Sequence, residues 1–202
     1  MHVRGATTID ERVTGTTMPA EKRVFYSSVY GSSQAYAEEI AKQLGREAVD
    51  ITDVELSSEG LVEEAPLIFV GPVYGVKLLG AENAARVARK LDKALISQGS
   101  AKHVAFVSVG LTDPEKAAKK DSSAKFFGDE KDRVERFYVP GRIHYPKLKL
   151  AHRTAIKAML LYYSSKPGAT AFERELVASG AIGFDKVDVS LAAPVIKWAE
   201  TR

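Results

Sequence analysis

The stretch VFYSSVYGSSQAYAEEIAKQLG (residues 24–45) joins a short apolar segment to a helical pattern through a turn rich in hydroxyl groups. Residues 23–28 are apolar and rich in β-forming side chains, as in a buried strand. Tyr36, Ile40 and Leu44 then recur at the four-residue spacing of one helix face. The sequence therefore predicts a strand, a tight turn and a helix in succession.

The same alternation continues along the chain. Further strands are predicted at residues 46–52, 65–71, 102–110 and 134–143. Further helices are predicted at 81–99, ending at Gly99, at 150–163, and at 190–200 with Ser190 as the N-cap. Strands that alternate with helices form a doubly wound α/β fold, a parallel sheet with helices on both faces. Such proteins bind ligands outside the carboxyl ends of the strands.

The amino-acid composition excludes several kinds of active site. The chain has 202 residues, a formal net charge of +3 and no cysteine, which excludes disulfides, thiolate metal sites and a cysteine nucleophile. The four histidines lack ligand spacing, so we expect no metal site. We expect a flexible leader at residues 1–21 and a single domain at 22–202, with a charged insertion at about 112–133.

No stretch of the sequence predicts a membrane span. The longest uncharged stretch in the middle of the chain, residues 65–76, is about half as long as a spanning helix needs. The N-terminal residues lack the apolar run of a secretory signal. We therefore expect a cytoplasmic protein. The mild basic excess comes with no nucleic-acid recognition motif, so we expect no nucleic-acid partner.

The first turn carries the strongest functional signal. Helix N-termini present unpaired N–H groups and the positive end of the helix dipole, which together bind phosphate. The turn holds no lysine and matches neither GxxxxGK[ST] nor GxGxxG, which argues against a nucleoside triphosphatase and an ordinary dinucleotide site. A serine-rich N-cap without a ligand is the alternative. We favour phosphate, with Ser27, Ser28, Ser32 and Ser33 as its ligands. Tyr30 and Gly31 of the same turn are further candidate residues of the site.

Two further loops follow predicted strands that end at the same edge. The loop after residue 71 contains Pro72, Val73, Tyr74 and Gly75, and Tyr74 there could stack on an aromatic ring. The loop after the fourth strand contains Val109, Gly110 and Leu111. Ordinary turns explain each loop alone, but three such loops at one edge indicate a ligand site.

These three loops resemble the flavodoxin-like family. That resemblance implies a five-stranded parallel sheet of order 2-1-3-4-5 and a bound flavin mononucleotide (FMN). It also implies that the first loop holds the FMN phosphate and that the other two flank the isoalloxazine ring. The sequence SSVYGSS has one residue more than the usual flavodoxin loop [ST]x[ST]GxT, and serine in place of threonine.

The second half of the chain is similar to the flavodoxin-like, quinone-dependent protoporphyrinogen oxidases. The similarity lies in the charged insertion and in GRIHYPK, where Gly141, Tyr145, Pro146 and Lys147 match a G-x-x-x-Y-P-[KR] element. It implies an oxidoreductase with a small-molecule redox substrate and a quinone as partners. Since the flavin would perform the chemistry, we assign no catalytic acid or base.

Two alternatives to this oxidoreductase stay open. One is a flavodoxin-type electron carrier or FMN-binding domain without its own substrate, although carriers of that family are acidic and this chain is not. The other is a domain that lacks flavin and binds a partner. The basic helix at residues 147–166 carries apolar side chains outside its main stripe, which predicts either packing on the sheet or peripheral contact with the inner face of a membrane.

Overall fold

The computed structural model describes residues 22–54, 56, 60–95 and 102–202. The expected leader at 1–21 and the expected helix end at Gly99 lie outside the described residues.

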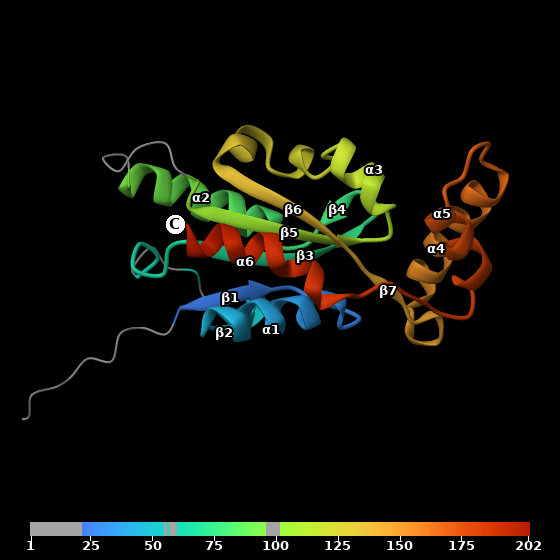
Figure 1. Ribbon diagram of the computed structural model, residues 1–202, viewed down its shortest axis with the longest axis horizontal. Coiled ribbons are helices and arrows are strands. Elements are labelled where there is room, and N and C mark those ends of the chain that lie inside the picture. Colours follow the sequence, from blue (N-terminus) through green and yellow to red (C-terminus); the bar gives the residue numbers. More distant parts are fainter. Residues whose placement is uncertain (1–21, 55, 57–59, 96–101) are drawn as a thin grey trace, which may run out of the picture.

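Five parallel strands form the sheet, in the order β2-β1-β3-β5-β6 (Figure 1). They are β1 (Arg23–Tyr26), β2 (Glu47–Asp50), β3 (Leu67–Tyr74), β5 (Val104–Gly110) and β6 (Val134–Pro140). Counting only these strands, the order is 2-1-3-4-5, as expected. A short strand, β4 (Lys77–Leu78), pairs antiparallel with the end of β3.

Helices cover both faces of the sheet. On one face, α1 (Ser32–Leu44) and α6 (Ala193–Glu200) pack on Val24, Ile68 and Ala105. On the other face, α2 (Ala81–Ala94) packs on Phe25 and Phe106. Adjacent residues of β1 and β5 thus enter opposite cores, as the two-residue period of a strand requires. The doubly wound α/β fold is confirmed.

A separate unit lies beyond one end of the sheet (Figure 1). It contains the short helix η5 (Tyr145–Lys147), α4 (Leu150–Ser165) and α5 (Ala171–Ser179). The chain enters it through β7 (Arg142–Ile143) and leaves it through β8 (Phe184–Asp185), and these strands pair antiparallel. We call residues 145–183 the arm. Leu148 and Leu176 of the arm form an apolar cluster with Phe184 of β8.

Several predicted boundaries were wrong. The second strand stops at Asp50, because the Asp50 carboxylate accepts a hydrogen bond from Thr52 N and starts a 3-10 turn, η1 (Ile51–Asp53). The third strand continues to Tyr74 because of its hairpin with β4. The predicted strand at 134–143 breaks at Gly141, whose N–H bonds to the Gly110 carbonyl at the end of β5.

Two helix boundaries also differ from the prediction. Ser190 does not cap the last helix: it lies in a 3-10 turn, η6 (Val189–Ala192), which Asp188 caps, and α6 starts at Ala193. Helix α2 ends at Ala94, and Leu95 forms its C-cap.

Helix α5 was not predicted, although Thr170 and Glu173 form a complete capping box at its start. In the segment expected as an insertion, the chain forms α3 (Pro114–Lys119) and two 3-10 turns, η3 (Ala124–Phe126) and η4 (Gly128–Arg133). No helix in the described part of the chain is long and apolar enough to cross a membrane.

Candidate functional site

The loop after β1 is anchored to the sheet and turns sharply at Gly31. Ser27 N donates to the Val70 carbonyl at 2.9 Å, which continues the pairing of β1 with β3. Ser28 Oγ accepts a hydrogen bond from Gly31 N at 3.1 Å, so its own hydroxyl hydrogen stays available to a ligand. Gly31 has φ +85°, a conformation that favours glycine, and a Cβ there would meet no atom within 4 Å. The surroundings of Gly31 are therefore open.

The amino end of α1 has the features of an anion site. No side chain caps it, so the first N–H groups of the helix lack an intrahelical or side-chain acceptor. Ser33, in the first turn, is 1% exposed, and its Oγ has no hydrogen-bond partner among the described residues. Ser32 beside it is also buried. An anion bound here would accept hydrogen bonds from the N–H groups and benefit from the helix dipole.

The predicted second loop is a β-hairpin. Pro72, Val73 and Tyr74 belong to β3, and Tyr74 pairs with Lys77 across the turn. Gly75 makes the turn at φ +58°. At Gly71 the backbone runs so close to Leu79 that a Cβ would lie 2.0 Å from the Leu79 carbonyl oxygen. The hairpin thus fixes the position of the Tyr74 side chain.

The third predicted loop makes contacts with the core, with Gly141 and with the arm. Val109 and Gly110 are the last residues of β5, and the Val109 side chain lies in the core under α1 and α6. The Gly110 carbonyl accepts a hydrogen bond from Gly141 N at 2.7 Å. Leu111 packs on the apolar cluster of the arm. This segment therefore joins the sheet to the arm.

Two of the predicted site residues meet a third side chain from the arm. The ring of Tyr74 stacks on the imidazole of His152, with centroids 5.0 Å apart and planes at 15°. Tyr30 meets Tyr74 edge-on at 6.2 Å, and its hydroxyl lies 2.6 Å from His152 Nδ1. The Tyr30 hydroxyl also accepts a hydrogen bond from Lys149 N at 3.2 Å. We call Tyr30, Tyr74 and His152 the aromatic trio.

Burial changes the acidity of Tyr74. Loss of solvent raises the pKa of its phenol to about 12, and the neighbouring Tyr30 adds to the rise. Tyr74 is therefore neutral at physiological pH and offers an uncharged aromatic face. His152 covers one face of the Tyr74 ring. A flat ligand would therefore stack on the other face or take the place of the imidazole.

His152 was not among the predicted site residues. It lies on the first turn of α4, more than seventy residues after Tyr74, and only the path of the chain through β7 brings it to the site. Its sequence neighbours carry no ligand spacing that would have singled it out. The nearest signal was GRIHYPK, because that segment directs the chain from β6 into the arm.

Fold and site together define a doubly wound α/β protein with an uncapped helix end and an aromatic surface at the carboxyl edge of its sheet. A family model described as a flavodoxin domain matches residues 23–168. The chain therefore belongs to the flavodoxin family, whose domains usually bind flavin, typically FMN. None of the curated proteins matches the chain.

The site residues of this chain fit FMN. The open amino end of α1 and the unpartnered hydroxyl of Ser33 suit the phosphate. The aromatic trio suits the isoalloxazine ring, because Tyr74 is held at a fixed position with an uncharged face. Tyr30 lies directly before Gly31, so the phosphate end and the ring end of such a site adjoin each other.

Proposed function

We propose that the chain is an FMN-dependent oxidoreductase. The observation that carries this proposal is the pairing of an uncapped α1 terminus, with a buried unpartnered Ser33 hydroxyl, and the stacked Tyr74 beside it. FMN would supply the two-electron redox chemistry. The protein's residues would bind the phosphate, orient the ring and keep water from one of its faces.

The test is the visible absorption spectrum of the purified protein, titrated with FMN. We expect a perturbed flavin spectrum, and we expect the variant Ser32→Ala plus Ser33→Ala to bind FMN at least tenfold more weakly. A matched control is Ser164→Ala plus Ser165→Ala, since those hydroxyls donate only to carbonyls of their own helix. Absence of binding at tens of micromolar FMN would leave a partner-binding domain as the function.

We further propose that its reaction resembles that of the quinone-dependent protoporphyrinogen oxidases. This proposal is supported by residues 141–147, which connect the sheet to the arm beside the candidate site. Gly141 bonds to the end of β5, and Tyr145 packs in the apolar cluster of the arm, so the segment holds the arm against the loops. The arm would then form one wall of the substrate site.

A potentiometric titration of the FMN-loaded protein separates this enzyme from an electron carrier. A carrier stabilises the one-electron state of the flavin, whereas a two-electron oxidase has no need to. Consumption of a porphyrinogen with a quinone as acceptor would support the specific reaction. A large one-electron fraction without turnover would favour the carrier.

Contact with a membrane surface is also a proposal, and it rests on α4. Leu161 and Tyr162 are 71% and 61% exposed, and the helix contains no acidic residue. Exposed Lys157 lies on the same helix. An apolar strip beside cations suits the inner face of an anionic membrane, which would place a cytoplasmic protein near membrane quinones.

Cosedimentation with vesicles that contain anionic lipid tests this contact. We expect binding that falls with added salt and falls at least fivefold in Leu161→Ser plus Tyr162→Ser. Val76→Ser is the control, because Val76 is 84% exposed but lies on the β3–β4 hairpin. Equal binding by all three proteins would exclude α4 as the contact.

A further inference from the structure

A pocket lies on the α2 face of the sheet. It encloses about 300 Å³ between the ends of β5 and β6 and the segment that contains α3 and η3. Its lining includes Val73, Ser108, Ala117, Phe126 and Arg136. This volume is at the lower end of the range for ligand sites, and it accommodates a molecule of two fused rings.

Ser108 is the buried polar group of this pocket. It is 2% exposed, and its Oγ has no hydrogen-bond partner in the described part of the chain. On β5 it lies two residues after Phe106, so its side chain points to the α2 face, where the pocket is. A buried hydroxyl without a partner destabilises the fold, and a ligand that hydrogen-bonds to it would remove that cost.

The polar groups of the pocket include the Arg136 guanidinium, which only donates, the Ser108 hydroxyl, which can donate or accept, and the Asp121 carboxylate, which only accepts. Arg136 Nε donates to Asp121 Oδ2 at 2.5 Å, and Arg136 Nη1 donates to the carbonyls of Lys131 and Val134. Asp121 Oδ1 already accepts from the backbone and side chain of Ser123. The Asp121 carboxylate is thus used within the protein, whereas the Ser108 hydroxyl and Arg136 Nη2 are not engaged by these bonds.

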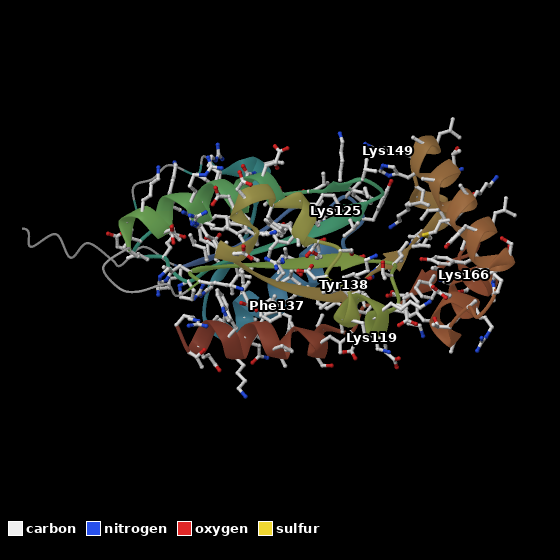
Figure 2. The ribbon with its side chains drawn as sticks, turned by 90° about the horizontal axis from the view of Figure 1, so that it is seen from above. Lys119, Lys125, Phe137, Tyr138, Lys149 and Lys166 are labelled. Atoms are coloured by element: carbon white, nitrogen blue, oxygen red, sulfur yellow. The ribbon has the colours of Figure 1, made fainter. Side chains whose placement is uncertain are left out.

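Part of the lining is an apolar wall. Figure 2 shows Lys119 and Lys125 on the body of the molecule, whereas Lys149 and Lys166 belong to the arm. Val73, Ala117 and Phe126 supply apolar contacts, with Lys125 Nζ 5.0 Å from the centre of the Phe126 ring. Tyr138, also in the lining, exchanges two hydrogen bonds with the backbone of Thr112 and so holds the rim in place.

We propose that this pocket binds a planar bicyclic aromatic molecule whose carbonyl or carboxylate oxygens accept hydrogen bonds from Ser108 and Arg136. Ser108 and Arg136 would bind oxygen atoms at the edge of the ligand. The apolar wall would pack against its flat rings. The pocket shares Val73 with the β3–β4 hairpin, and Thr112 follows Leu111 directly. Its occupant would therefore lie beside the candidate FMN site, and only its use as a redox partner of the flavin rests on the proposed function.

Calorimetric titration of the full, FMN-free chain tests the site. The probes are 2-methyl-1,4-naphthoquinone, which carries neutral carbonyls, 2-naphthoate, which carries a carboxylate, and 2-naphthylmethylamine, which carries a cation. We expect at least one oxygen-bearing probe to bind and the amine to bind at least tenfold more weakly. The two oxygen-bearing probes distinguish a quinone from an aromatic acid. Because the chain has no cysteine, the quinone has no thiol to alkylate.

Two variants locate the binding. Ser108→Ala removes an unpartnered hydroxyl, so the fold should keep or raise its melting temperature while the probe binds about fivefold more weakly. Ala117→Phe fills the pocket and should abolish binding. Ser164→Ala is the control, since it removes a serine hydroxyl that donates to the Leu161 carbonyl within α4, away from the pocket.

The proposal is overturned if neither oxygen-bearing probe binds, if the amine binds equally well, or if Ser108→Ala and Ala117→Phe both bind like the unaltered chain. Because these titrations contain no flavin, a protein that fails to bind FMN can still pass them. A protein that binds FMN can likewise fail them.

Discussion

Tyr74 is the single residue on which the flavin proposal depends most, because it links the aromatic trio to the sheet. Its ring is fixed by the hairpin turn at Gly75 and by contact with His152. The Tyr74 hydroxyl is not required for stacking, whereas the ring is. Substitutions can therefore separate the two parts of the side chain.

We expect Tyr74→Phe to bind FMN like the unaltered chain and Tyr74→Ala to bind it roughly five- to tenfold more weakly, since an aromatic contact contributes about 0.5–1.5 kcal/mol beyond its buried area. Fluorescence quenching of FMN measures the affinity. Tyr162→Ala is the control, because Tyr162 is exposed on the arm. If Tyr74→Ala bound FMN normally, the ring would have to bind elsewhere.

At the scale of elements, Glu173 connects the arm to the segment before β6. Its carboxylate is 3% exposed and accepts hydrogen bonds from Lys116 Nζ on α3, at 2.7 Å, and from Lys166 Nζ after α4, at 2.8 Å. Burial alone would raise the pKa of Glu173, but these two bonds and the one from Thr170 N outweigh it and lower the pKa to about 2.

This shift gives a pH dependence with a definite sign. The folded pKa of Glu173, about 2, lies below the ordinary value of 4.5, so the ionised carboxylate stabilises the fold fully above about pH 4.5. That stability is lost as the pH falls from about 4.5 to 2. We expect acid melting in this window, followed by far-ultraviolet circular dichroism, to begin with the arm.

The matched variant for this window is Glu173→Gln. It leaves two ammonium groups without their common partner and should lower the free energy of unfolding by about 3 kcal/mol at pH 7. Its stability should also vary less between pH 4.5 and 2 than that of the unaltered chain. Glu175→Gln, a change at an exposed ion pair with Lys186, should have a small effect. An equal acid response in all three proteins would contradict the assignment.

For the molecule as a whole, the sheet and the arm differ in burial. The residues of β5 are buried without exception, whereas no residue of α4 is fully buried. Amide exchange should therefore be slowest in β3 and β5 and fastest in α4. Bound FMN should slow exchange at the start of α1 and in the first turn of α4, where His152 lies. Exchange measured by mass spectrometry with and without FMN checks both statements, and protection confined to α2 would contradict the site.

The parts of the fold that sequence predicted follow from local periodicity. Buried strands such as β5 and amphipathic helices such as α2 carry their burial pattern in their own residues. The turn at Gly31 was visible because glycine and serine have specific backbone and capping roles. In contrast, the break at Gly141 depends on a hydrogen bond to Gly110, and the place of His152 depends on the whole arm. Neither feature produces a periodic pattern in the sequence.

The pairing of β7 with β8 brings the entry and exit of the arm together, since Arg142 lies opposite Asp185 and Ile143 opposite Phe184. The two ends of the arm therefore lie side by side, so the arm could be removed or replaced as one unit. A tight two-residue turn grafted between Ile143 and Phe184 would close the hairpin without altering the five-stranded sheet. Such a shortened chain would turn one natural protein into a scaffold on which other units could be exchanged over the same flavodoxin core.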